Sequence, residues 1–90
     1  MGTALLKIKI MPESPKTNLD EIQKKAQDII IKNKGQSPRF EKEPIAFGLI
    51  ALIATFAIDE SLSTDIFEEK LQSIKNVRSA NIIDFRRAIG

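Results

Sequence analysis

The chain has 90 residues, 42% of them hydrophobic and 29% charged, with a formal net charge of +2 and neither cysteine nor histidine. This length and composition predict one globular domain around a single core. The missing residue types exclude disulfides, thiol chemistry, a Ser–His triad and the commonest transition-metal ligands, and the charge is too small to indicate nucleic acid or a membrane by itself.

The chain begins with a pattern typical of a strand that buries one face. Apolar residues alternate with Lys7 and Lys9 from Ala4 to Met11, and Pro12 and Pro15 interrupt the pattern. No long apolar segment of the kind found in signal peptides occurs here, so we expect a cytoplasmic protein.

A helix is predicted next, starting at Asn18, which caps it, with Glu21 reaching back as the second half of a capping box. Lys32 and Lys34 suit a helix C-terminus, and Gly35 is the expected terminator. The apolar residues with helical spacing are Leu19, Ile22, Ala26, Ile29 and Ile30.

Two further strands follow the helix. The segment Pro38–Ala46 is polar and contains two prolines, which predicts an edge strand. The segment Leu49–Ile58 is almost entirely apolar, which predicts a central strand buried on both faces. Pro44 and Gly48 mark the junction between the two strands. The apolar run Ile45–Ile58 is shorter than the ~20 residues that a membrane-spanning helix needs.

The last third of the chain predicts a loop, a helix and a strand. Asp59, Glu60 and Ser61 form the loop, and Ser63 or Thr64 caps the helix. That helix carries Phe67, Leu71 and Ile74 on one face and ends at Asn76. The final strand, Val77–Arg86, alternates imperfectly, as expected at a sheet edge.

The order strand–helix–strand, strand–helix–strand is the split βαβ pattern. Short connections and right-handed crossovers place the first and third strands in the centre of the sheet. We therefore predict an α+β, ferredoxin-like sandwich: a four-stranded antiparallel sheet with both helices on one face and the other face open.

The residues offer little for catalysis. Glu13, Asp59, Glu60 and Asp84 show no pairing pattern and are expected to be solvated, and neither a Gly-rich phosphate loop nor a zinc-ligand spacing occurs. Two binding alternatives remain open, an RNA-binding module and a small-ligand regulatory module. The first lacks the aromatic residues that stack on bases, and the loop Asp59–Ser63 lacks the glycines of a ligand loop.

Three segments carry a family resemblance: Lys9–Pro15, Glu43–Leu49 and Asp84–Arg87. On these segments the chain resembles the archaeal elongation factor 1-beta family, and also the C-terminal exchange domain of the eukaryotic factor, over nearly its whole length. The resemblance implies a ferredoxin-like fold, a single exchange domain over residues 1–90, and guanine-nucleotide exchange on the GTPase elongation factor 1-alpha. It implies no catalytic residue, cofactor, metal, membrane or direct nucleic-acid contact.

The resemblance also implies a partner-binding site. Phe47, with Ala46 and Gly48, is the expected apolar wedge, and a core or hairpin-packing role for Phe47 stays open as the alternative. Eukaryotic relatives have a lysine next to the last residue, whereas this chain ends Ala88-Ile89-Gly90. Arg86 and Arg87 are the nearest cations, either as substitutes or in pairs with nearby carboxylates. In the predicted topology these arginines and Phe47 leave opposite ends of the sheet.

Overall fold

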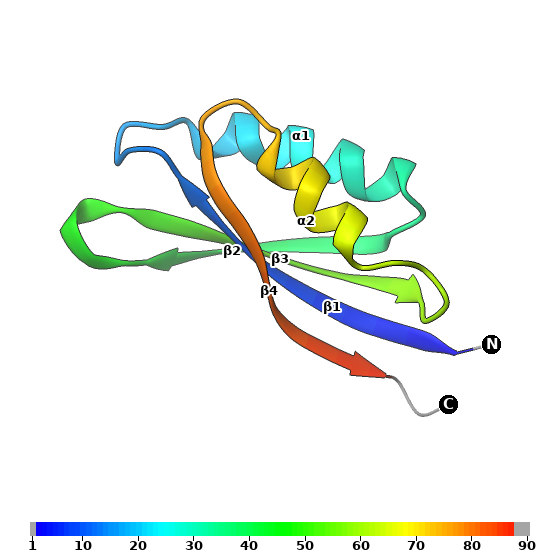
Figure 1. The fold of residues 1–90 in the computed structure, drawn as a ribbon. Helices are drawn as coiled ribbons and strands as arrows, with labels where there is room; N and C mark the ends of the chain where they lie inside the picture. The colour runs from blue at the N-terminus through cyan, green and yellow to red at the C-terminus, as the bar shows by residue number, and fades with distance from the viewer. Residues whose placement is uncertain (1, 88–90) are drawn as a thin grey trace.

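A computed structural model of the chain describes residues 2–87. Within that range the strands and helices follow the order β1–α1–β2–β3–α2–β4, with one short 3-10 turn, η1, between β2 and β3 (Figure 1). Their bounds are β1 Thr3–Pro12, α1 Leu19–Lys32, β2 Gln36–Pro44, η1 Ala46–Gly48, β3 Ile50–Asp59, α2 Asp65–Gln72 and β4 Val77–Arg87.

Within residues 2–87 the four strands form one antiparallel sheet in the order β2-β3-β1-β4. Both helices cover the same face of this sheet (Figure 1), and the other face is open. This arrangement confirms the predicted ferredoxin-like fold with β1 and β3 in the centre. No helix in the described range is both long and apolar enough to span a membrane.

The core lies between the helices and the inward positions of β1 and β3. In the register of these strands Leu6 lies opposite Phe56 and Ile10 opposite Leu52, and all four side chains are buried. Because directly opposed residues point to the same face, the alternation predicted for β1 places every second residue against the helices. From α2, Phe67 packs on Phe56 with 4.9 Å between ring centroids.

Helix α1 begins and ends with specific backbone contacts. The Asn18 side chain accepts hydrogen bonds from the backbone N–H groups of Asp20 and Glu21, which confirms the predicted cap. The predicted return bond from Glu21 to the N–H of Asn18 is not formed in the described structure. At the C-terminus the left-handed residue is Lys34, with φ 72°, and Gly35 follows it by donating to the carbonyl of Ile30 at 2.7 Å.

The predicted terminator, Gly35, therefore lies one residue after the left-handed position, and a glycine is required there by the lack of space rather than by its own φ angle. A Cβ atom there would overlap the Cγ2 atom of Ile30 and lie 3.0 Å from Cδ2 of Phe56. We therefore expect Gly35→Ala to lower the free energy of unfolding by about 1–3 kcal/mol. Urea denaturation measures this change. The neighbouring Gln36→Ala, at an exposed position, is the control, and equal stability of the two variants would contradict the steric explanation.

Two predicted boundaries are wrong by two residues. Strand β2 spans Gln36–Pro44 rather than residues 38–46, because Ser37 takes a positive φ of 52° and a register shift lets pairing begin before Pro38. Its other end stops at Pro44 because Ala46 belongs to the turn η1.

The second helix is shorter than predicted. Thr64 occupies the N-cap position of α2, but its side chain makes no capping hydrogen bond. Ile74 is buried as predicted, although it lies beyond the helix end at Gln72. Asn76, with φ 71°, then turns the chain into β4.

Strand β4 contains a bulge that accounts for its imperfect alternation. Lys7 pairs with Asp84 and Ile8 with Ile82, which leaves Ile83 without a direct partner. Next to this bulge, the Glu68 carboxylate of α2 accepts a hydrogen bond from the backbone N–H of Ile82 at 2.7 Å. An outward N–H of the edge strand is thereby satisfied by a side chain of the covering helix.

Candidate partner-binding site

The connection between β2 and β3 is a tight turn at one end of the molecule. The N–H of Leu49 donates to the carbonyl of Ala46, and the N–H of Ile45 donates to the carbonyl of Leu49. Phe47 (φ 62°, ψ 32°) and Gly48 (φ 77°) both have positive φ angles. Two consecutive left-handed residues correspond to a type I′ turn, whose twist matches a β-hairpin.

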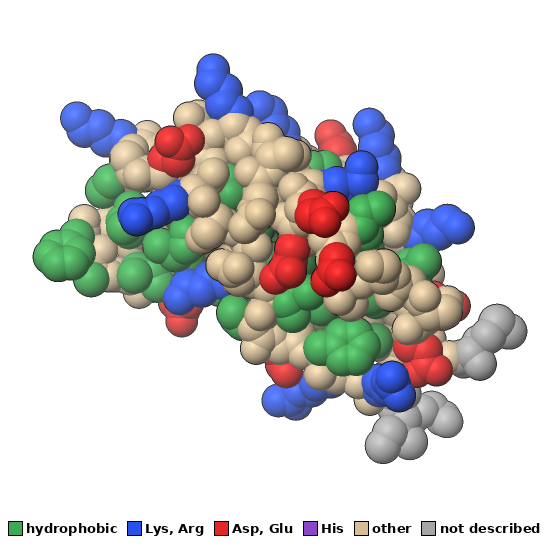
Figure 2. Space-filling model, viewed as in Figure 1, with side chains coloured by type: hydrophobic (Ala, Val, Ile, Leu, Met, Phe, Trp, Pro, Cys, Tyr) green, Lys and Arg blue, Asp and Glu red, His purple; other side chains and the backbone are tan. Residues whose placement is uncertain are grey.

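Phe47 lies at the tip of this turn and is 94% exposed. The space-filling view shows a hydrophobic side chain projecting from the end of the β2–β3 hairpin (Figure 2). Such exposure contradicts the alternative in which Phe47 packs in the core or on the hairpin. A left-handed conformation costs a non-glycine residue about 1–2 kcal/mol. Because the ring is exposed and its backbone is strained, the stability of the fold does not explain a phenylalanine at this position.

Other apolar side chains lie in the segments next to the turn. Pro15 of the β1–α1 connection lies beside the tip. A Cβ atom placed on Gly48 would be 3.8 Å from the Cβ atom of Pro15. Two of the three segments that carry the resemblance, Lys9–Pro15 and Glu43–Leu49, therefore meet at this end (Figure 1). The hairpin-tip patch consists of Pro15, Pro44, Ile45, Ala46, Phe47, Leu49 and Ile50.

Sequence reasoning identified Ala46, Phe47 and Gly48 but missed the rest of the hairpin-tip patch. Pro12 and Pro15 predict only the end of the first strand, because the position of this connection next to the hairpin depends on the packing of the whole sheet. Leu49 and Ile50 belong to the segment predicted as a buried strand, whereas Ile50 is 37% exposed. The signal in the sequence for these further patch residues is the apolar run, which continues past the turn into the exposed end of β3.

Some of the charged side chains behind the hairpin-tip patch form ion pairs. Lys9 lies 3.6 Å from Glu43, and Lys42 lies 3.9 Å from Asp20. The patch itself is apolar, and an exposed apolar surface of this kind is suited to packing against another protein.

Arg86 and Arg87 lie at the other end of the sheet. The Nε atom of Arg86 is 3.0 Å from Asp84, and that of Arg87 is 3.9 Å from Glu60. The ten residues of β3 separate this end from the hairpin turn, a length of roughly 33 Å at 3.3 Å per residue. Both arginines thus lie beside carboxylates, which is one of the two alternatives, and they lie at the end of the sheet away from Phe47, as the topology predicts. The chain end Ala88-Ile89-Gly90 lies outside the described residues.

Asp59 organises the loop that faces Arg87. Its carboxylate accepts hydrogen bonds from the backbone N–H and the hydroxyl of Ser61, at 2.9 and 2.8 Å. These bonds, the backbone bond first, hold the pKa of the Asp59 carboxyl below its usual value. A carboxylate whose pKa is lowered by folding stabilises the fold above its unfolded pKa, and the effect is lost as the pH falls through the folded value.

We therefore expect Asp59→Asn to be less stable than the wild type at neutral pH, with a difference that begins to shrink at about pH 4 and is lost as the pH falls through the lowered pKa of Asp59. The measurement is the urea midpoint of both proteins between neutral and acidic pH. Asp65→Asn, at another exposed carboxylate, serves as the control. A difference independent of pH would show that the Asp59 charge plays no part.

The open face of the sheet lacks what RNA recognition needs. Outward positions of β1 and β3 carry Leu5, Lys7, Lys9, Ile53 and Thr55, and no aromatic ring occupies an outward position of either strand in the described range. Nor do three or more potential metal-ligating side chains gather within residues 2–87. The RNA-binding alternative gains no support from this arrangement.

Fold and site together describe a small α+β domain with an exposed aromatic side chain at the tip of one hairpin. Residues 5–88 match the EF-1 guanine nucleotide exchange domain. The chain belongs to this family, as the resemblance predicts, and its role is GDP/GTP exchange in translation elongation.

The chain is similar over nearly its full length to curated archaeal proteins called Elongation factor 1-beta. It is 39% identical to that of Methanosarcina barkeri over 88 residues, which cover 97% of this chain and 99% of the relative. Identity to the Pyrococcus abyssi protein is 40% over 79 residues, covering 83% and 84% of the two chains. For the Haloarcula marismortui protein it is 36% over 83 residues, covering 91% and 93%.

Proposed function

We propose that this chain, as a single exchange domain over residues 1–90, accelerates GDP release from elongation factor 1-alpha in the cytoplasm. It does so by binding the nucleotide-free GTPase more tightly than the GDP-bound form. The observation that carries this proposal is Phe47, a fully exposed aromatic side chain held in a strained turn within a family of exchange domains.

The mechanism needs no covalent step. Suppose that the chain binds the empty GTPase more tightly than the GDP-bound GTPase by a given factor. By thermodynamic linkage, GDP then binds the complex more weakly than it binds the free GTPase, by the same factor. Each 1.4 kcal/mol of preference is about a tenfold loss of GDP affinity. Phe47 inserts into the partner as the anchor, flanked by Ala46 and by Gly48, which lets the backbone turn closely behind the ring.

Labelled-GDP release from the cognate elongation factor 1-alpha, with and without this chain, tests the proposal. The release rate should rise with the concentration of the chain and saturate. Calorimetry should find a higher affinity for the nucleotide-free GTPase than for its GDP complex. Unchanged release together with equal affinities would overturn the proposal.

Arg86 and Arg87 form the second proposed contact, directed at the phosphate and magnesium region of the GTPase. We expect the double variant Arg86→Gln, Arg87→Gln to slow exchange about 5- to 30-fold, since charged rim contacts act mainly on association and on local phosphate affinity. The effect should shrink as salt concentration rises. Arg78→Gln, at the other end of β4, is the matched control, and an equal effect of both changes would exclude a specific contact.

A further inference from the structure

The β2–β3 hairpin extends beyond the rest of the sheet (Figure 1). Pairing between β1 and β3 ends at Ile10 and Leu52, whereas β2 remains paired with β3 as far as Ile50. Within the described structure, the hydrophobic core contains no residue of the segment 43–51. The end of this hairpin is therefore a two-stranded ribbon with neither a third strand beside it nor the core beneath it, and such a ribbon is only marginally stable by itself.

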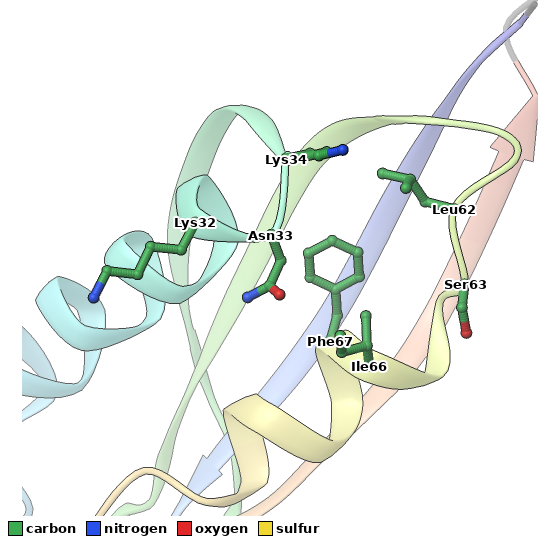
Figure 3. A pocket seen from close by; sticks show the side chains of 7 residues that line it. All are labelled: Lys32, Asn33, Lys34, Leu62, Ser63, Ile66 and Phe67. Carbon is green, nitrogen blue, oxygen red and sulfur yellow. The ribbon is translucent and has the colours of Figure 1, made fainter.

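The β3–α2 connection, at the opposite end of the sheet, is fixed by apolar packing. Leu62 of this connection packs against the core, and its side chain points toward the ring of Phe67 (Figure 3). The base of the hairpin is joined to β1 by the ion pair between Lys9 and Glu43 at 3.6 Å, and a pair of partly exposed charges contributes little to stability. Another contact must therefore hold the hairpin tip if Phe47 is to project in one direction.

Pro15 of the β1–α1 connection is in position to make this contact. A Cβ atom placed on Gly48 would lie 3.8 Å from the Cβ atom and 3.9 Å from the Cγ atom of Pro15. Apart from the residues that adjoin Gly48 in the chain, no other described atom comes within 4 Å of that position. The space between the proline ring and the hairpin backbone thus has room for about one methyl group, while the ring of Phe47 stays 94% exposed. The proline therefore stops any displacement of the tip toward the β1–α1 connection.

The β1–α1 connection is itself held by hydrogen bonds. The backbone N–H of Glu13 donates to the carbonyl of Asn76 at 2.9 Å, which joins the connection to the start of β4. The N–H of Thr17 donates to the carbonyl of Ser14 at 3.1 Å, so Pro15 occupies the second position of a β-turn, where its fixed φ angle is favoured. The N–H of Ser14 also donates to the Thr17 hydroxyl at 3.2 Å. The proline ring is therefore carried by a well-fixed support.

We propose that Pro15 is a positioning residue that supports the hairpin tip and limits the directions in which Phe47 projects. Its effect on the hairpin belongs to the free protein, whereas its effect on exchange rests on the proposed function. An anchor that is already ordered loses less conformational entropy on binding than a mobile one. Pro15 thus favours partner binding through the backbone that carries Phe47.

Backbone amide relaxation of the free chain tests this support. In Pro15→Gly the order parameters of Phe47 and Gly48 should fall from about 0.85, typical of rigid backbone, toward about 0.6. Lys16→Gly is the matched control, because it places a glycine in the same β-turn and retains the proline ring, and it should keep rigid values at both amides. Pro15→Ala retains the Cβ atom and should show a smaller loss of order. Each glycine variant should lower the thermal midpoint by no more than about 8 °C, so all variants stay folded.

The exchange assay supplies a second readout. The concentration of chain that gives half-maximal stimulation of GDP release should rise about 2- to 10-fold in Pro15→Gly, with an unchanged maximal rate because Phe47 is retained. Equal order parameters of Pro15→Gly and Lys16→Gly at residues 47 and 48 would overturn the proposal, and so would an unchanged half-maximal concentration. If the wild type itself does not accelerate GDP release, the proposed function fails, and the order parameters alone decide the role of Pro15.

Discussion

Replacing Phe47 by asparagine should abolish most of the exchange activity while leaving the fold equally or more stable. Truncation of an aromatic anchor at a protein interface typically costs 2–4 kcal/mol of binding, so the efficiency of stimulated GDP release should fall about 30- to 1,000-fold. Asparagine tolerates the left-handed conformation that strains phenylalanine. The free energy of unfolding should therefore stay constant or rise by up to about 1 kcal/mol. Nucleotide-release assays and urea denaturation measure the two effects.

Two controls make this prediction specific. Phe47→Leu keeps much of the apolar surface and should retain part of the activity. Ile31→Asn removes another exposed apolar side chain, on α1, and should leave exchange unchanged. Full exchange by Phe47→Asn would mean that the hairpin tip is not the anchor, and the proposed site would then be wrong even though the family membership would stand.

Phe67→Ala should have the largest effect on stability. Phe67 is fully buried and packs on Phe56, and loss of a buried phenylalanine costs about 3–5 kcal/mol through lost burial and the cavity that remains. A domain of 90 residues has roughly 5–13 kcal/mol in total. The variant should thus lose a large part of that stability, as a denaturant titration will show.

The adjacent Ile66→Ala is the matched control, because Ile66 is 37% exposed on the same helix and should cost less than about 1 kcal/mol. The exchange assay distinguishes a loss of stability from a loss of partner binding. Trimethylamine N-oxide, which strengthens burial, should restore activity to Phe67→Ala but not to Phe47→Asn. Restoration of both variants, or of neither, would contradict the assignment of Phe67 to the core and Phe47 to the interface.

Most of the fold could be predicted because it follows from local patterns. The alternation around Lys7 and Lys9 and the helical spacing from Leu19 to Ile30 depend on residues a few positions apart, and both patterns are confirmed. The errors concern backbone conformation. The positive φ of Ser37 and the bulge at Ile83 arise from pairing with neighbouring strands, and no residue type in these positions signals them.

The candidate site was predictable only in part. The segment around Phe47 was identified through the family resemblance, and Gly48 indicated a turn. The left-handed conformation of Phe47 itself contradicts residue preferences, so no propensity argument predicts it. The proximity of Pro15 to Gly48 and the bond between Glu68 and Ile82 join residues far apart in the sequence. Such contacts exist only once the sheet and helices have assembled.

The hydrogen bond from Ile82 to Glu68 bears on how copies of this chain behave toward each other. Sheet borders with free amide groups invite other strands to attach and grow into aggregates. At one border Pro38 and Pro44 lack the amide hydrogen that such growth uses, and at the opposite border the glutamate already occupies it. These residues remove some of the free amide hydrogens at both borders, which should lower the tendency of the sheet to pair with strands of other copies.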